Sequence, residues 1–129
     1  MKEVRLDRYV MIAIGGAIGA IARYQLAAMI QARIPAGFPW GTFIVNITGC
    51  LVMGVATTLL AERLVVHPNW RFLIPIGFIG AYTTFSTFEM ETFRAVTEGS
   101  WLIGAANVVG SVVAGYVALW LGVTLTRTL

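Results

Sequence analysis

The sequence has few charged residues and very little metal-binding or nucleophilic chemistry. Charged residues make up 12% of the 129 residues and hydrophobic residues 58%, and a mean hydropathy of +0.82 excludes a water-soluble domain. The one cysteine, Cys50, excludes an intrachain disulfide and a cysteine metal cluster. The one histidine, His67, precedes Pro68 in a polar connection, without a nucleophile–base partner set. An enzyme is therefore the least favoured class of function.

Runs of basic residues are also missing. The formal net charge is +3, from nine lysines and arginines against six acidic residues, but the basic residues are scattered singly, with no run of them beside aromatics. A nucleic-acid-binding surface needs such clusters, so this class of partner is excluded. We predict one membrane domain over residues 1–129.

Four apolar segments are each close to the ~20 residues that cross a hydrocarbon core of ~30 Å. The polar connection Glu62 to Arg71 separates the second from the third. The first is not a cleavable signal peptide, because Arg23, Tyr24 and Gln25 follow its apolar run and three more segments come after it. The pattern predicts an all-α, multi-pass membrane protein with four transmembrane helices. The first covers about residues 9–30 and the fourth about 101–126, and the third includes 77–93. The second is entered at Trp40 and lies within the uncharged stretch 34–61.

The first segment carries a small-residue row on one helical face. Gly15 and Gly19 form a GxxxG pattern, and Arg23 continues the same i, i+4 row. Small residues at this spacing let another helix approach closely, so we expect this face to pack against protein. Two interpretations of Arg23 stay open: its side chain extends to the lipid headgroups, or it has a role at a pore vestibule.

The third segment contains a helix-weakening stretch, with the sequence GFIGAYTTFSTFEMETF over residues 77–93. Gly77 and Gly80 weaken the helix, and the β-branched Thr83 and Thr84 follow at once. Backbone groups that leave a helix in lipid find no water, so such a stretch survives only where protein buries it or where it lines an aqueous path. We predict a helix that breaks near 80–84, with carbonyls that suit a cation and hydroxyls that suit an anion.

Polar side chains lie at middle depth in three of the four segments. A single buried amide such as Asn46 is explained by an interhelical clasp, which hydrogen-bonds one membrane helix to another. Polar residues in three segments together favour a polar track. They are Thr42 and Asn46 in the second segment, Thr84, Thr87 and Glu91 in the third, and Asn107 and Ser111 in the fourth.

Two phenylalanines follow the predicted break and share a helical face. Phe85 and Phe88 are three residues apart, a spacing whose ordinary explanation is packing. They alternate with Ser86 and Thr87, however, and a phenyl edge carries partial positive charge that can hold an anion weakly. Glu91 is either a proton or gating group or an ordinary interfacial carboxylate.

Four stretches together resemble the Fluc or CrcB-type family of small dual-topology fluoride channels, over nearly the whole chain. They read GGAIGAIARY, GTFIVNITG, GFIGAYTTFSTF and NVVGS. The specific combination is TTFSTF after GxxG, with an asparagine in the preceding segment. This chain departs from the family at Ile103, where the family has a tyrosine, and at Asn107, where the family has a small or hydroxyl residue.

The resemblance implies passive fluoride export through the cell (inner) membrane by an antiparallel homodimer with two pores, which limits fluoride toxicity. It implies a sodium ion at the dimer centre, held by the backbone carbonyls of Gly80 and Thr83 from both subunits. It also implies that Asn46 donates its amide to fluoride, that Arg23 lies at the vestibule and that Glu91 lies along the track. The candidate pore residues are Thr42, Asn46, Phe85, Thr87, Phe88, Asn107 and Ser111.

Four short helices are too small to enclose a pore alone, so we expect a two-fold oligomer. In an antiparallel pair the broken helices meet at the midplane, where carbonyl oxygens can hold a cation. The basic residues predict mainly one orientation under the positive-inside rule, whereas dual topology predicts near balance. Six lie on the side of the N terminus, Lys2, Arg5, Arg8, Arg63, Arg71 and Arg127, against Arg23, Arg33 and Arg94 on the other.

Two membrane alternatives stay open beside the channel. A proton-coupled small multidrug exporter also has four spans, but it needs a carboxylate deep in the bundle, and the first segment contains no acid. A purely structural membrane subunit would use the small-residue faces for packing only and would pass no ions. Residue types alone do not distinguish fluoride from chloride, so the identity of the ion follows from the resemblance.

Overall fold

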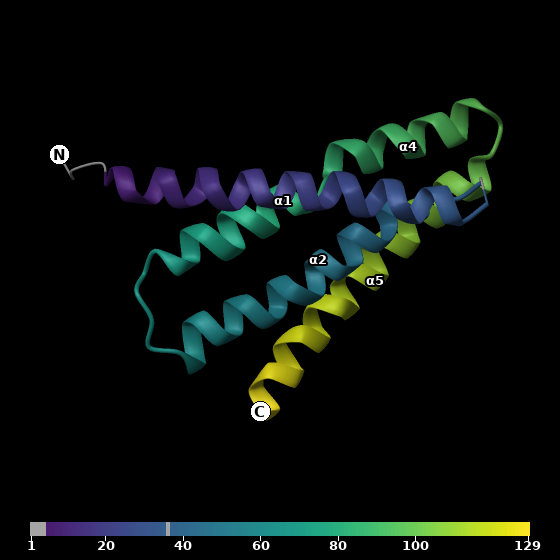
Figure 1. The fold of residues 1–129 in the computed structure, drawn as a ribbon. Coiled ribbons are helices and arrows are strands. Elements are labelled where there is room, and N and C mark those ends of the chain that lie inside the picture. The colour runs from purple at the N-terminus through teal and green to yellow at the C-terminus, as the bar shows by residue number, and fades with distance from the viewer. Residues whose placement is uncertain (1–4, 36) are drawn as a thin grey trace.

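The computed structural model describes residues 5–35 and 37–129, and within these ranges the chain is helical without a β-strand (Figure 1). The all-α prediction is therefore confirmed. Lys2, which enters the predicted basic count, lies outside the described residues. The helices are α1 (Leu6–Arg33), α2 (Trp40–Thr58), the π-helices η1 (Leu59–Arg63) and η2 (Phe72–Ile79), then α3 (Gly80–Tyr82), α4 (Phe85–Thr97) and α5 (Trp101–Thr128).

Three helices are long and apolar enough to cross a membrane, as expected for a multi-pass membrane protein. They are Leu6–Arg33, Trp40–Arg63 and Trp101–Thr128, with 28, 24 and 28 residues. At ~1.5 Å per residue they are about 36–42 Å long, more than a hydrocarbon core of ~30 Å requires. The predicted third segment is divided among η2, α3 and α4, and none of these three alone has that length.

The helix ends follow local sequence signals. Ile34 is extended (φ −106°, ψ 133°) because a residue that precedes proline is driven out of the helical region, and α1 therefore ends before Pro35. α2 begins directly after Pro39. α4 ends at Thr97, and Gly99 takes a positive φ of 86° in the turn to α5, which a residue without a Cβ adopts at little cost.

The predicted connection Glu62 to Arg71 is too long at both ends, since Trp70 and Arg71 are helical, and so are Glu62 and Arg63. Glu62 and Arg63 form the end of η1, which extends α2 by one wide turn. The Glu62 carboxylate accepts two hydrogen bonds from Arg127, at 2.6 and 3.0 Å, and the Arg63 guanidinium donates to the Arg127 carbonyl. These contacts tie the extra turn to the end of α5.

Close packing of helices explains the small residues. Figure 1 shows α2 and α5 lying along each other and α1 beside η2. Gly15 and Gly19 are buried, and a Cβ on either would collide with the backbone of Leu73 or Phe78 in η2. The prediction that the GxxxG face packs against protein is thus confirmed. Gly54 and Gly122 allow the same close approach between α2 and α5.

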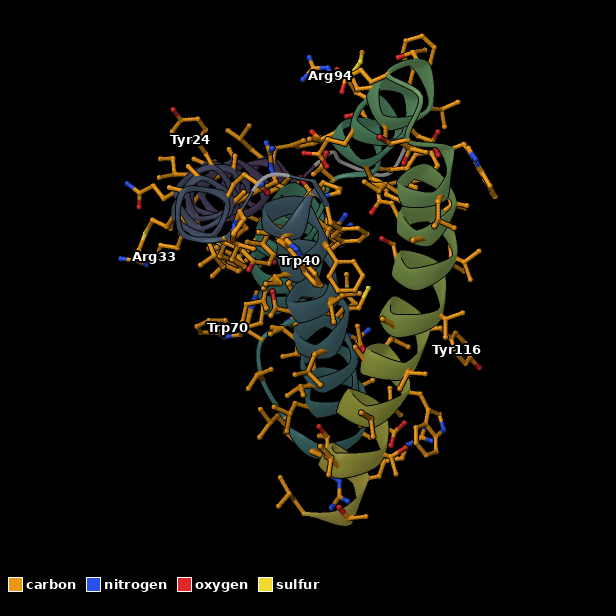
Figure 2. All side chains as sticks on the ribbon, turned by 90° about the vertical axis from the view of Figure 1, so that its right-hand side faces the viewer. Tyr24, Arg33, Trp40, Trp70, Arg94 and Tyr116 are labelled. Carbon is orange, nitrogen blue, oxygen red and sulfur yellow. The ribbon has the colours of Figure 1, made fainter. Side chains whose placement is uncertain are left out.

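The outside of the helices is covered by large apolar side chains. Tyr116 is 72% exposed and points away from the bundle in Figure 2, and Trp101 and Trp120 are 69% and 55% exposed. The fully buried large side chains are few, Val45, Ile79 and Asn107. So much apolar surface on one chain is stable when lipid or another protein covers it.

Candidate functional site

The helical path is interrupted between α3 and α4 by two extended residues. Thr83 has φ −83° and ψ 154°, and Thr84 has φ −147° and ψ 118°. Thr84 also caps α4, because its hydroxyl accepts a hydrogen bond from the Thr87 N–H at 3.3 Å. Gly80 itself is helical (φ −59°, ψ −36°), so the residues that leave the helix are the two β-branched threonines.

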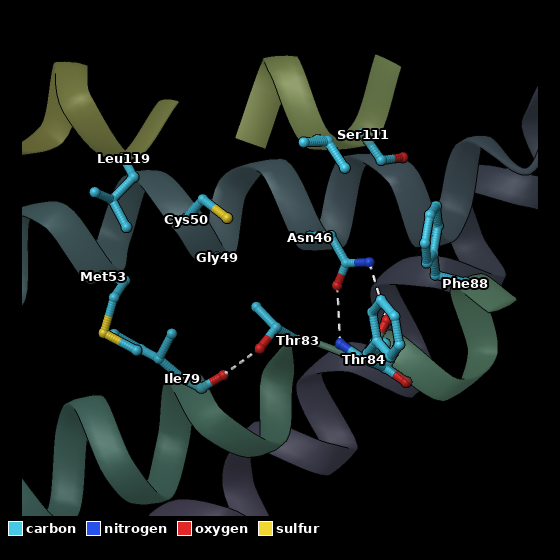
Figure 3. A pocket seen from close by; sticks show the side chains of 12 residues that line it. Asn46, Gly49, Cys50, Met53, Ile79, Thr83, Thr84, Phe88, Ser111 and Leu119 are labelled. Carbon is cyan, nitrogen blue, oxygen red and sulfur yellow. Dashed lines mark hydrogen bonds between the residues drawn. The ribbon is translucent and has the colours of Figure 1, made fainter. Parts of the chain in front are cut away.

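Asn46 of α2 forms hydrogen bonds with the backbone N–H and carbonyl of Thr84 at the interruption. Its Oδ1 accepts from the Thr84 N–H at 2.8 Å, and its Nδ2 donates to the Thr84 carbonyl at 3.1 Å (Figure 3). In a continuous α-helix that N–H would bond to the Gly80 carbonyl, which therefore loses its helical partner. The predicted interhelical clasp is thus present, and one of the two amide hydrogens of Asn46 remains for another acceptor.

The residues just before Thr84 are also fixed from neighbouring helices. The Tyr82 hydroxyl bonds to Thr48 of α2 at 2.9 Å, and the Thr83 methyl lies where a side chain on Gly49 would be. Arg23 of α1 donates from Nε to the Ala81 carbonyl at 3.2 Å. Four consecutive residues, 81–84, are therefore each held by α1 or α2.

A cavity of about 310 Å³ lies beside the interruption and brings together five predicted site residues. The rings of Phe85 and Phe88 have centroids 5.7 Å apart. Phe88 is 6% exposed, but Phe85 is 74% exposed, so this side of the cavity is open in a single chain. The predicted residues along its wall are Asn46, Thr83, Phe85, Phe88 and Ser111, beside Cys50 and other apolar neighbours.

A second cavity, of about 230 Å³, collects the remaining polar candidates other than Asn107 and Gly80. It is lined by Arg23, Thr42, Thr87 and Glu91, and by Thr84, which also lines the first cavity. The Thr42 hydroxyl donates to Glu91 Oε1 at 2.8 Å, whereas Glu91 Oε2 is buried without a hydrogen-bond partner among the described residues. Thr84 therefore lies in the wall of both the aromatic cavity and the polar one.

A third cavity, of about 260 Å³, continues from Glu91 towards the connection between α1 and α2. Gln31, Arg94 and Glu98 line it together with Glu91, and the exposed Arg94 and Glu98 open it to solvent. Thr84 lines both the first and the second cavity, and Glu91 lines both the second and the third. The three cavities follow one another between the phenylalanines and the end of α4.

Asn107 lies outside these cavities, buried between α4 and α5 at 1% exposure. Its Nδ2 donates to Thr92 Oγ1 at 3.0 Å, and its Oδ1 accepts from Ser111 Oγ at 3.2 Å. Sequence reasoning missed Thr92, together with Tyr82 and Thr48. Thr92 lies one helical turn after Phe88, and this spacing alone would have placed the two residues on the same face of the helix. Only the structure shows the partners of Tyr82 and Thr48.

The residues around the interruption offer backbone rather than side-chain ligands for a metal ion. Within the ranges 5–35 and 37–129, no group of three or more histidine, cysteine, aspartate or glutamate side chains is placed to bind a metal. The Gly80 carbonyl has lost its helical partner, and the extended Thr83 follows three residues later. Carbonyl oxygens are hard ligands that suit a hard cation.

Comparison with known proteins gives consistent matches over nearly the whole chain. The family model described as CrcB-like protein, Camphor Resistance (CrcB), matches residues 10–123, a range that contains every candidate residue. A protein of Solibacter usitatus named fluoride-specific ion channel FluC is 53% identical over 120 residues, 93% of this chain and 98% of the relative. Proteins of the same name from Acidobacterium capsulatum and Nitratidesulfovibrio vulgaris are 47% and 41% identical, over 89% and 91% of this chain and 92% and 94% of the relatives.

Proposed function

The chain belongs to the CrcB-like protein family, and from this we propose that it is a fluoride-specific ion channel of the cell (inner) membrane, which lets fluoride leave the cell passively and limits its toxicity. The observation that carries the proposal is 53% identity, over 93% of the chain, to a protein named for this activity. The family is one of channels rather than enzymes. The neighbouring cavities beside the interruption, which share Thr84 in their walls, support a conduction path.

The donors along this path suit a small, strongly hydrated anion. Fluoride that leaves water needs close replacement donors, and the remaining amide hydrogen of Asn46, the hydroxyl of Thr87 and the ring edges of Phe85 and Phe88 provide them. Ring edges carry only partial charge, so they hold the ion without trapping it. In this proposal Arg23 draws the anion into the polar cavity, and Glu91 lies along the track beside Thr42.

We propose that η2, α3 and α4 together form one interrupted span, so that the chain crosses the membrane four times and pairs with an antiparallel copy. Two observations support a second copy. Phe85, a predicted pore residue, is 74% exposed, and the apolar cavity beside it is open on that side. An antiparallel partner would close both cavities by the same contacts, which gives two pores related by two-fold symmetry.

We further propose a sodium ion where the two interruptions meet, bound by the carbonyls of Gly80 and Thr83 from each subunit. The lost helical partner of the Gly80 carbonyl supports this site. The ion would supply positive charge that links the two chains through their backbones. Dialysis against N-methylglucamine, with no sodium, should lower the stability of the dimer, and sodium should restore it more effectively than potassium. A dimer that is equally stable in both would refute the sodium site.

The test of the proposed function is fluoride efflux from liposomes that contain the purified protein, followed with an ion-selective electrode beside a chloride control. We expect rapid fluoride efflux without chloride efflux. No fluoride efflux from folded protein would overturn the channel proposal, and drug-driven proton exchange would then test the multidrug-exporter alternative.

A further inference from the structure

Asn107 of the predicted pore set lines none of the three cavities and is buried between α4 and α5. It joins three hydrogen bonds into a chain. Ser111 Oγ, on the wall of the aromatic cavity, donates to Asn107 Oδ1, Asn107 Nδ2 donates to Thr92 Oγ1, and Thr92 Oγ1 donates to the Phe88 carbonyl at 2.9 Å. The three hydrogen bonds therefore link Ser111, in the cavity wall on α5, to the backbone carbonyl of Phe88 on α4.

The Phe88 carbonyl fixes which group donates in each of these three hydrogen bonds. A carbonyl oxygen only accepts, so the single proton of Thr92 is committed to Phe88, and Thr92 can only accept from its other neighbour. The amide of Asn107 must then turn its nitrogen to Thr92 and its oxygen to Ser111. Ser111 gives its only proton to that oxygen. Towards the cavity, Ser111 is left with lone pairs, which repel an anion.

The other hydroxyls of the path show how unusual a free proton is here. Thr42 gives its proton to Glu91, and Thr84 gives its proton to Thr87 Oγ1 at 3.1 Å. Thr87 accepts that bond, and its own proton has no acceptor among the described residues. Of these hydroxyls, Thr87 is ready to donate to an anion, whereas Ser111 can do so only by releasing Asn107.

We propose that Asn107 is a positioning residue that competes with the permeating anion for the proton of Ser111. The inference rests on the proposed channel function. When Ser111 turns its O–H to the anion, the proton stays on Ser111, but the buried Asn107 oxygen loses its donor. This penalty favours return of the hydrogen bond to Asn107 and departure of the anion. Conduction requires binding that is weak enough for the ion to leave, and Asn107 would provide that weakness at Ser111.

The experiment measures channel current against fluoride concentration in planar bilayers. Asn107→Leu keeps the branched shape and the number of heavy atoms but cannot accept the hydrogen bond from Ser111. The half-saturating fluoride concentration should fall about tenfold, the scale of one hydrogen bond to a charged group, and the maximal current should fall with it. Thr92→Val leaves the Asn107 amide free to turn over and should shift the curve the same way by a smaller factor.

A double-mutant cycle separates this role from packing. In a Ser111→Ala background, Asn107→Leu should no longer shift the half-saturating concentration, because no proton remains to compete for. The matched control is Thr126→Val, which removes a buried hydroxyl that bonds Gly122 within the same helix at 2.7 Å. This control should leave the curve unchanged.

The outcomes distinguish a failure of the proposed channel function from a failure of the proposed role of Asn107. If the wild-type protein passes no fluoride current, the proposed function fails. If it conducts, but Asn107→Leu and Thr92→Val leave the half-saturating concentration unchanged, or shift it equally without Ser111, the positioning role of Asn107 is refuted. Thr92→Val keeps the test decisive if Asn107→Leu does not fold.

Discussion

Replacement of Asn46 by aspartate perturbs the interruption and the proposed path with almost no change in side-chain shape. The wild-type amide exchanges two hydrogen bonds with Thr84, at 2.8 and 3.1 Å. In Asn46→Asp, the oxygen that accepts from the Thr84 N–H is kept. The other oxygen replaces the Nδ2 donor and faces the Thr84 carbonyl, so one attraction becomes a repulsion.

The two consequences of Asn46→Asp differ in size. Loss of the donor removes one hydrogen bond to the Thr84 carbonyl, which costs about 1–3 kcal/mol, less than the ~5–15 kcal/mol that typically stabilises a folded domain. A carboxylate about 4 Å from fluoride repels it by ~4 kcal/mol at an effective dielectric constant of ~20, which corresponds to about a thousandfold lower occupancy. The variant should fold and yet pass almost no fluoride.

Fluoride efflux from liposomes checks this prediction, with elution in size-exclusion chromatography to establish that the variant is folded. Asn69→Asp is the matched control, because it makes the same chemical change in the connection before η2, outside the three cavities, where Asn69 bonds Asp7 at 2.9 Å. We expect efflux from the control at a rate close to that of the wild type. Folded Asn46→Asp protein that passes fluoride as fast as the wild type would refute both the repulsion and the assignment of Asn46 to the path.

Three further predictions concern the ring, the packing and the orientation. Phe88→Ile should reduce fluoride efflux sharply while the protein stays folded, because the variant keeps apolar volume but removes the ring edge, and normal efflux would assign Phe88 to packing alone. Gly19→Ala should lower the unfolding temperature in detergent, by an amount equivalent to ~1–3 kcal/mol, because its Cβ collides with the Phe78 backbone, whereas the nearest neighbours at Gly16 are 3.9 Å away and Gly16→Ala should be nearly neutral. Tags on the C terminus should be labelled from both sides of intact cells if insertion is dual, and labelling from one side only would contradict dual topology.

The sequence predicted the features that depend on short-range pattern. Apolar length predicted the three long helices, and the GxxxG row predicted the packed face of α1, because both follow from properties of one helix. The start of the connection after the second segment was misplaced at Glu62, which belongs to η1, since the ion pair that holds this extra turn comes from Arg127, 65 residues away. Long-range partners of this kind leave no local signal.

The same distinction applies to the candidate site. Spacing placed Phe85 and Phe88 on one face, and the structure puts both on one cavity wall. Spacing also grouped Asn107 with Ser111, but it did not show that Asn107 is buried behind the wall with Thr92 as a partner. Helical periodicity gives the face on which a residue lies, whereas the neighbouring helix decides whether that face lines a cavity or closes a contact.

Asn46 shows that a clasp and a pore residue need not be alternatives. An asparagine amide offers two donor hydrogens and an acceptor oxygen, and Thr84 uses one donor and the acceptor. Two bonds to one backbone unit fix the plane of the amide and hence the direction of its second N–H. Figure 3 shows the amide nitrogen on the side of Asn46 that faces Phe88. A donor that must replace the hydration of a small anion needs such fixation, because a freely rotating amide would present its oxygen as often as its nitrogen. The same two hydrogen bonds therefore give the interruption its backbone partner and would give the proposed path an oriented donor.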